Sequence, residues 1–210
     1  MTDTSPRWPV EPDPARDLLL DTRTLQALTH PVRVRILHLL RSGGPSTASR
    51  LAGQLGLNSG ATSYHLRCLA DAGLITEDSE RGDGRDRWWQ AAHRSTFYDP
   101  AQVPPGQREL SAAYLSAVAS QYAERVQRAV DEVPTLPDAW LRTWVLSDYR
   151  LVLTPSEHGK LLDELLAVIG RYRQFDAEDA SGAEPGAEQV IVQLQSFVLP
   201  GTLAAGDAAR

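Results

Sequence analysis

Apolar residues recur at helical spacing over most of the first hundred positions, and turn-forming residues interrupt them at regular points. The predicted helices span residues 18–28, 31–42, 47–56 and 59–73. Pro31 suits the first turn of the second helix, and Ser46 and Asn58 are the expected N-caps of the third and fourth. Gly56 stands where a left-handed C-cap is expected. The pattern therefore predicts four short helices in close succession.

A different period follows the fourth helix. Residues 74–80 and 87–92 are β-prone and flank the glycine-containing polar turn 81–86, which predicts a β-hairpin. The turn that joins the third and fourth helices, residues 55–59, is short enough to hold them at a steep angle. Residues 46–92 thus form a helix–turn–helix–hairpin unit.

A long helix is predicted over residues 107–133, after a proline-rich boundary and before Pro134 and Pro137. One apolar seam runs along it: Leu110, Tyr114, Ala117, Val118, Tyr122, Val126 and Val130. A helix of this length with a single seam usually packs on a partner helix. We therefore assign residues 106–133 as a dimerisation helix.

The last third of the chain reads as a strand–helix–strand unit over residues 138–200. Strands are predicted over residues 140–153 and 190–199, and the helix 156–173 between them starts at a Thr154–Glu157 capping box. We expect the two strands to pair with each other and the unit to pack against the long helix. The predicted fold class is α+β.

Composition adds limits to this picture. Residues 1–17 hold four prolines and are expected to form a disordered arm, not a signal peptide. No apolar run is long enough to span a membrane, and the single cysteine, Cys68, allows no intrachain disulfide. We therefore expect a cytoplasmic protein with no membrane partner.

Charge is distributed unevenly along the chain. The net charge is −6, yet residues 21–98 hold ten arginines against seven acids, while the rest holds eleven basic residues against twenty acids. The local surface, and not the total charge, decides attraction to phosphates. An excess of this size permits nucleic-acid binding but does not establish it.

Candidate chemistry lies on the outward face of the predicted helix 59–73. Small or hydrogen-bonding side chains gather there, near the end that reaches base edges in the major groove: Ser59, Ser63, Tyr64 and Arg67, with His65 at the edge of the face. Three arginines, Arg81, Arg85 and Arg87, surround the glycines of the hairpin turn and suit a phosphate backbone or a minor groove. Double-stranded DNA is the partner that these residues indicate.

The run TASRLAGQLGLNSGATSYHLRCLADAGLITE resembles the helix-turn-helix of the ArsR-type winged-helix regulators. SYHLRCLADAGLI is similar to the Ser-x-His-Leu-x-x-Leu-x-x-Ala-Gly-Leu signature of that family, and THPVRVRILHLL to its preceding helix. The resemblance covers about residues 20–98. It implies a winged-helix domain over residues 18–99, a homodimer and an inverted-repeat operator. It also implies recognition-helix positions for Ser63, Tyr64, His65 and Arg67 and wing positions for the three hairpin arginines.

The chain departs from the metal-sensing members of that family. The helix before the recognition helix has no cysteine, the long helix has no histidine, and the five histidines of the chain show no ligand spacing. We therefore expect no metal site and no cofactor. The C-terminal unit is absent from minimal members, so its purpose does not carry over from the resemblance.

Several of these residues also have a purely structural interpretation. His65 either contacts a base or braces the helix, and the hairpin arginines either contact DNA or lie in a solvated turn. One of Trp88 and Trp89 should be core. Trp140, Trp144 and Tyr149 form an aromatic cluster that either lines a small-molecule pocket or packs as core.

A DNA-binding regulator is the expected function, and repression is its expected effect on transcription. Two other classes of function are possible interpretations of the sequence. No phosphate loop, His-Glu-x-x-His or Gly-x-Ser-x-Gly motif is present, so an enzyme is not expected. The alternative is a winged-helix module for protein contacts or small-molecule sensing, with weak or conditional DNA binding. Loss of affinity with rising salt would distinguish the DNA reader.

Overall fold

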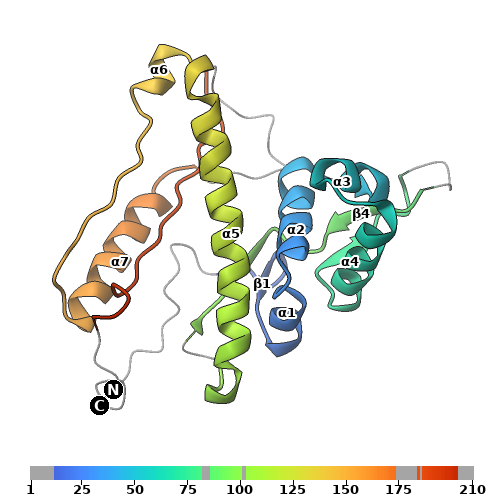
Figure 1. Cartoon of the computed structure of the whole chain (residues 1–210), viewed down its shortest axis with the longest axis horizontal. Coiled ribbons are helices and arrows are strands. Elements are labelled where there is room, and N and C mark those ends of the chain that lie inside the picture. Colours follow the sequence, from blue (N-terminus) through green and yellow to red (C-terminus); the bar gives the residue numbers. More distant parts are fainter. Residues whose placement is uncertain (1–11, 82–85, 101–102, 174–183, 185, 203–210) are drawn as a thin grey trace. The chain divides into compact units, whose positions relative to one another are not determined.

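The computed structural model describes residues 12–81, 86–100, 103–173, 184 and 186–202. The chain divides into two units, residues 1–179 and residues 180–210, which are treated separately. The first unit holds every helix and strand assigned in the described residues (Figure 1).

The elements run in this order: β1 (Asp17–Leu19), α1 (Thr22–Ala27), α2 (Pro31–Gly43), β2 (Ser46–Thr47), α3 (Ala48–Leu55), α4 (Ser59–Asp71), β3 (Ile75–Glu77), β4 (Trp88–Ala91), β5 (Ser95–Phe97), α5 (Arg108–Glu132), α6 (Asp138–Leu141) and α7 (Pro155–Gly170). Short 3₁₀ turns, Pro105–Gln107 and Val133–Thr135, flank α5.

The ends of the helices follow from local chemistry. Pro31 opens α2, and Asn58 caps α4 by accepting a hydrogen bond from the Ala61 amide at 2.8 Å. Gly56 ends α3 in the left-handed conformation with a φ of 66°. These three predictions are confirmed. The expected cap Ser46 is wrong, because Ser46 belongs to β2 and the hydroxyl of Thr47 accepts from the Arg50 amide instead.

The hydrophobic core lies where α2, α4 and the β3–β4 hairpin meet. Its fully buried side chains come from all of these elements and from the adjoining α1, α3 and the turn after α4: Leu25, Ile36, Leu51, Leu66, Leu69, Leu74 and Ile75. Trp89 is buried in this core and Trp88 is half-buried, as the alternation of a strand requires. The core therefore holds α4 by one face only.

Two small sheets complete the first unit. Strand β4 pairs antiparallel with both β2 and β3, so the predicted hairpin is confirmed and gains a third strand. Strand β1 pairs in parallel with β5. The predicted helix 18–28 is therefore wrong in its first part: residues 17–19 are a strand, and the Asp21 capping box starts α1 at Thr22.

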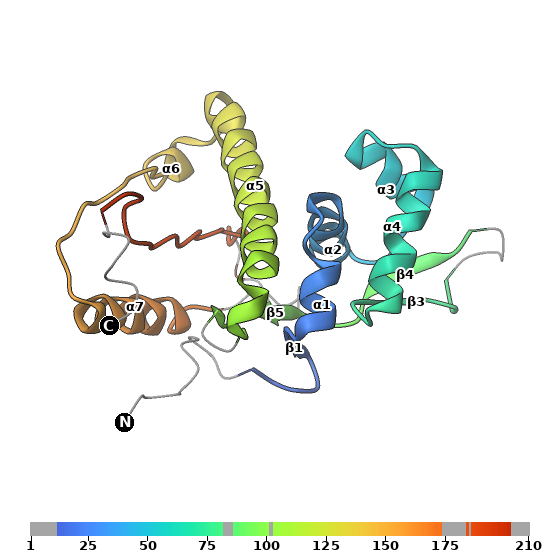
Figure 2. The same ribbon diagram turned by 60° about the horizontal axis from the view of Figure 1, so that its bottom comes forward.

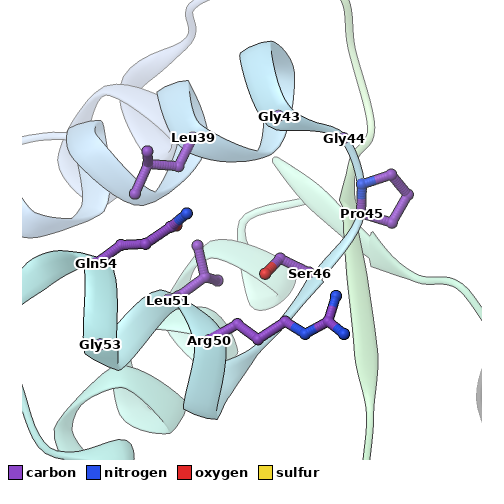
Figure 3. A pocket seen from close by; sticks show the side chains of 9 residues that line it. All are labelled: Leu39, Gly43, Gly44, Pro45, Ser46, Arg50, Leu51, Gly53 and Gln54. Atoms are coloured by element: carbon purple, nitrogen blue, oxygen red, sulfur yellow. The ribbon is translucent and has the colours of Figure 1, made fainter.

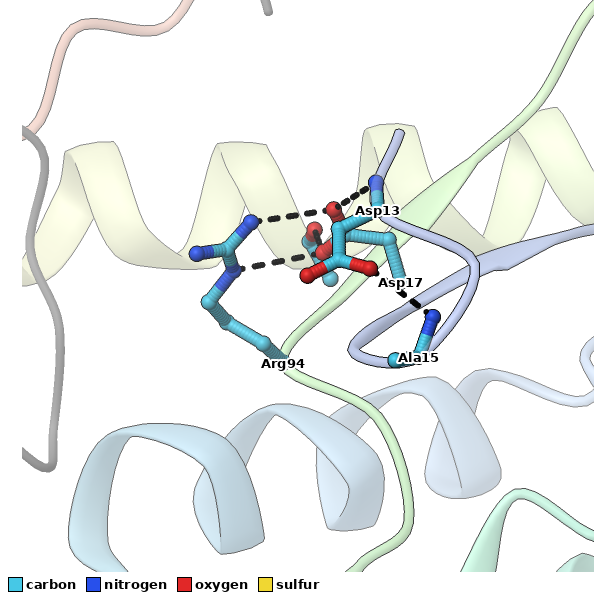
Figure 4. A network of polar contacts seen from close by, with 5 residues as sticks. Asp13, Ala15, Asp17 and Arg94 are labelled. Atoms are coloured by element: carbon cyan, nitrogen blue, oxygen red, sulfur yellow. Dashed lines mark hydrogen bonds and ion pairs between the residues drawn. The ribbon is translucent and has the colours of Figure 1, made fainter. Parts of the chain in front are cut away.

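A buried carboxylate fastens β1 to β5. Asp17 is 4% exposed and accepts hydrogen bonds from Arg94 Nε at 3.2 Å and Nη2 at 2.9 Å, and from the Asp13 amide at 2.9 Å (Figure 4). The Ser95 hydroxyl also donates to it. Burial alone would raise the pKa of Asp17, but these hydrogen bonds and the charge of Arg94 lower it to about 2.

The predicted disordered arm is thus wrong for residues 12–17. They form a turn, in which the amides of Arg16 and Asp17 donate to the Asp13 carbonyl, and then enter β1. These residues are ordered because Asp17 forms an ion pair with Arg94. The proline content of the segment carries no information on that distant partner. Residues 1–11 lie outside the described part of the chain.

Helix α5 confirms the predicted long helix to within a residue at either end. Its Ala117 is buried, and Tyr114 and Val118 pack against the core through α1 and α2. Part of the predicted apolar seam therefore packs against the core of the same chain and not against a partner helix. Leu115 and Val130 on the same helix stay exposed.

Polar contacts also join α5 to α2. Arg35 Nη2 donates to Glu124 Oε1 at 2.7 Å, and Arg125 Nη2 lies 3.1 Å from His38 Nε2. Burial, and then the charges of Arg125, Arg128 and Arg41, lower the pKa of His38 to about 4. His38 is therefore neutral at physiological pH, which lets it lie beside Arg125 without repulsion.

The C-terminal unit differs from expectation. Helix α7 is present with the predicted Thr154–Glu157 capping box. Neither predicted strand is assigned as one: Trp140 lies in α6, and residues 144–154 and 187–199 are in no helix or strand. A strand needs a ladder partner, and neither segment forms a β-ladder with any other described residue. The paired strand–helix–strand unit is thus not what these residues form.

The described residues hold neither a cluster of metal ligands nor a membrane-spanning helix. No three His, Cys, Asp or Glu side chains among them are placed to hold a metal ion. None of the helices that can be seen is both long enough and apolar enough to cross a membrane.

Candidate nucleic-acid interface

Helix α4 divides into a core face and a free face. Thr62, Leu66 and Leu69 are fully buried, whereas Tyr64 and Arg67 on the opposite side, and Ser59 at the start of the helix, are exposed. Ser63 is half-buried between the two faces. Tyr64 is 58% exposed, a large value for an aromatic side chain. The free face therefore presents a hydroxyl, a phenol and a guanidinium along one helix. Helix α4 lies beside strand β3 of the hairpin (Figure 2).

His65 lies apart from that group. Its ring packs against the ring of His30 at the start of α2, with centroids 4.6 Å apart, and its Nδ1 is buried without a hydrogen-bond partner in the structure. Burial, with help from the nearby charges of His30 and Arg33, lowers its pKa. The structure therefore places His65 as a brace between α4 and α2, and only its edge contact with Tyr64 reaches the free face.

The hairpin brings two of the three predicted arginines close to acids. Arg81 Nε lies 3.1 Å from Asp78 Oδ2, and Arg87 Nε lies 3.7 Å from Glu77 Oε1. Both guanidinium groups are exposed, so each ion pair is weak and a phosphate could replace the carboxylate. Arg85 lies outside the described residues.

Sequence reasoning missed one cation of this surface. Arg50, in the first turn of α3, has its guanidinium 4.7 Å from the centre of the Trp88 ring, and Arg81 lies over the same ring at 6.0 Å. The indole thus orients two guanidinium groups from separate elements through cation–π contacts. Arg50 is three residues after the Thr47 cap in the helix-turn-helix, but nothing in the sequence shows that it contacts Trp88.

An open hollow of about 480 Å³ lies between the end of α2 and α3 (Figure 3). Gly43, Gly44 and Pro45 line one side of it and Arg50 the other. Arg50 is the only ionisable residue in this lining. The hollow lacks the converging polar groups of a catalytic site, and its contribution is to leave Arg50 accessible.

The aromatic cluster expected in the C-terminal unit is spread along the chain. Trp140 is in α6, Trp144 is half-buried after it, and Tyr149 is 83% exposed on an extended segment. None of them lines the hollow beside Arg50 or the smaller cavity between α2 and α5. A ligand pocket at these three residues remains a prediction.

Comparison with known proteins places a helix-turn-helix domain over residues 28–78. That range runs from the end of α1 to the residue after β3 and includes the whole free face of α4. A curated relative, the HTH-type transcriptional regulator YgaV of Escherichia coli (strain K12), is 48% identical over 58 residues, which are 27% of this chain and 56% of the relative. The chain therefore spans about half the length of that relative, and over those 58 residues it is homologous to an HTH-type transcriptional regulator.

Three solved structures also resemble the chain, with low TM-scores. A fragment of a possible transcriptional regulatory protein from Mycobacterium bovis is 22% identical, covers 49% of this chain and 88% of that one, and has a TM-score of 0.31. A possible transcriptional regulator for arsenical resistance is 28% identical, with coverages of 53% and 97% and a TM-score of 0.30. M. tuberculosis Rv0081 is 28% identical, with coverages of 49% and 89% and a TM-score of 0.30.

Proposed function

We propose that the protein is a transcriptional repressor of the ArsR type that binds an inverted-repeat operator as a homodimer. Helix α4 enters the major groove, and the β3–β4 hairpin acts as a wing along the phosphate backbone. The observation that carries the proposal is the free face of α4: Ser59, Tyr64 and Arg67 are exposed within the helix-turn-helix domain that matches residues 28–78.

The cations around that face support the same assignment. Arg50 and Arg81 flank Trp88 and Arg87 stands on the hairpin, so guanidinium groups from α3 and the wing accompany Arg67 of α4. DNA affinity depends on such a local array, because each neutralised phosphate releases counterions. The overall charge of −6 is compatible with this array because the acids lie mainly outside residues 21–98.

The proposed dimer uses α5. The helix is 25 residues long, only part of its apolar surface packs on α1 and α2, and Leu115 and Val130 remain exposed. Two copies of α5 packed about a two-fold axis would cover these side chains and present two α4 helices to successive major grooves. Two-fold symmetry of the protein then requires two-fold symmetry in the operator.

Selection from a pool of random duplex DNA tests this function. The full chain should enrich an inverted repeat whose half-sites lie about 10 base pairs, or a multiple of that spacing, apart. Affinity for the enriched duplex should fall as salt rises, with a log–log slope close to the number of phosphates neutralised. Enrichment of no sequence, together with binding that ignores salt, would contradict the proposal.

Replacing Arg67 with alanine is expected to weaken binding to the selected duplex by about 1–3 kcal/mol and to relax preference at one base pair. The reason is loss of a bidentate contact from a guanidinium that is exposed on the free face of α4. Fluorescence anisotropy with duplexes substituted one pair at a time measures both effects. Arg142→Ala, an exposed arginine just after α6, is the matched control and should leave affinity and preference unchanged.

Replacing Arg50 with alanine is expected to behave differently, because this side chain would contact phosphate and not a base. Binding should weaken to a similar degree on all duplexes, and the salt slope should fall by about one. Trp88→Leu should act in the same direction by removing the cation–π contact, whereas Trp88→Phe keeps an aromatic face for Arg50 and should retain most of the affinity. A loss confined to one duplex would show that Arg50 reads a base instead.

A further inference from the structure

The segment between α6 and α7 is extended, apolar and uncovered. Residues 145–153 run between the two helices with no ladder to any described residue (Figure 1). The exposed apolar side chains of this segment are Val145, Leu146, Tyr149, Leu151, Val152 and Leu153. Val152 is 102% exposed. An extended apolar segment without a ladder partner resembles an open strand edge, which is a template for pairing with another chain.

The apolar area is of the size that a protein interface needs. Six large side chains at this exposure present on the order of 100 Å² each. Together they approach the roughly 800 Å² that each partner contributes to a standard interface. Monomers rarely leave a contiguous apolar patch above about 300–600 Å² open to water. An exposed apolar area of this size favours a segment that a partner covers.

The charges of the segment fit a second copy of the same segment as its partner. Asp148 and Arg150 flank Tyr149. Neither of them forms an ion pair with another residue in the described part of the chain. When two copies pair antiparallel with Tyr149 opposite Tyr149, each Asp148 faces Arg150 of the second copy. Centring the pair on either charged residue would instead place like charges opposite each other. Only the register on Tyr149 pairs both charges.

The apolar side chains agree with that register. Val145 comes to lie opposite Leu153 of the second copy, and Leu146 opposite Val152, so apolar residues meet at both ends of the ribbon. All four are exposed in the single chain. A two-fold axis through Tyr149 therefore pairs opposite charges and apolar side chains throughout the segment except where Ser147 lies opposite Leu151, and such self-complementarity is the requirement for an isologous contact.

We propose that residues 145–153 form a two-stranded antiparallel β-ribbon with the same residues of a second copy, in register on Tyr149. The ribbon extends the homodimer of the proposed function and does not depend on DNA binding. It also places α7, which begins at Pro155, beyond the end of the ribbon, about 20 Å from the two-fold axis. Only Gly159 is buried in α7, so the apolar residues of that helix are available to the same interface.

Cysteine cross-linking of the full chain tests the register. In a Cys68→Ala background, which removes the one natural thiol, Tyr149→Cys should form a disulfide-linked dimer under mild oxidation, because opposite residues have Cβ atoms about 4.5–5.5 Å apart. Val152→Cys is the matched control: it is at least as exposed, but the two copies would stand about 20 Å apart along the ribbon and should stay unlinked. No linkage through residue 149, or equal linkage through 152, overturns the proposal.

Charge exchange tests the same register without cysteine. Asp148→Arg alone should raise the dimer dissociation constant at least tenfold in sedimentation measurements, because two pairs of arginines then face each other. The exchange Asp148→Arg with Arg150→Asp restores opposite charges and should return the dissociation constant to that of the natural chain. If the exchange fails to restore it, the register is wrong. Neither test uses DNA, so a chain that cross-links through residue 149 but selects no operator contradicts the proposed function alone.

Discussion

Replacing Asp17 with asparagine should lower the free energy of unfolding by about 3 kcal/mol. Removing one partner of a buried ion pair leaves the other without its counter-charge, which commonly destabilises by about 3–5 kcal/mol. Arg94 is only partly buried, so we expect the lower end of that range. The variant also weakens the contacts of the carboxylate with Ser95 and the Asp13 amide. Denaturant titration measures the loss, with Asp86→Asn as an exposed acidic control.

The same carboxylate should set an acid limit on stability. Its pKa is about 2 in the folded protein and 3.8 ordinarily, so its contribution is present in full above about pH 4. That contribution, about 2 kcal/mol, is lost as pH falls from about 4 to 2. Asp17→Asn should remove this step from the profile of unfolding free energy against pH. Identical acid profiles for the variant and the natural chain would show that the ion pair does not hold β1 in place.

Replacing Leu66 with alanine should cost about 2–5 kcal/mol of unfolding free energy. Leu66 is fully buried on the core face of α4, and truncation removes both its burial and its packing against the neighbouring core side chains. Thermal and denaturant unfolding of the full chain measure the change. The DNA affinity of the fraction that remains folded should be close to normal, because Leu66 lies on the opposite side from Tyr64 and Arg67.

Tyr64→Ala on the same helix is the matched control for Leu66→Ala. Tyr64 is exposed, so its loss should change unfolding free energy by less than about 0.5 kcal/mol. If α4 reads DNA, Tyr64→Ala should instead weaken operator binding. A stable protein with unchanged affinity would show that the free face of α4 is not the recognition surface.

The sequence allowed α2, α3, α4 and α5 to be predicted because their signals are local. Apolar spacing defines the core face of a helix, and Pro31, Gly56 and Asn58 act within one turn of their own positions. The free face of α4 followed from the same spacing. The position of His65 could not be predicted in this way, because the packing of α4 on α2 decides whether its ring faces DNA or His30.

Features that depend on distant partners could not be predicted in this way. Strand β1 is three residues long and exists because β5 lies beside it. Arg50 joins the candidate interface through Trp88, a contact between α3 and β4 that leaves no periodic trace. The C-terminal strands were predicted from side-chain alternation, which is compatible with the extended backbone of residues 145–153 but carries no information on the ladder partner.

The pairing of β1 with β5 has a consequence for the order of folding. Asp17 and Arg94 are 77 positions apart, and α1 to α4 and the hairpin all lie between them. Closing so long a loop is entropically unfavourable until the intervening helices have become compact. During synthesis β1 therefore leaves the ribosome before β5, and it can pair only after β5 has emerged. Strand β1, the first strand among the described residues, is therefore expected to be among the last elements to reach its final position.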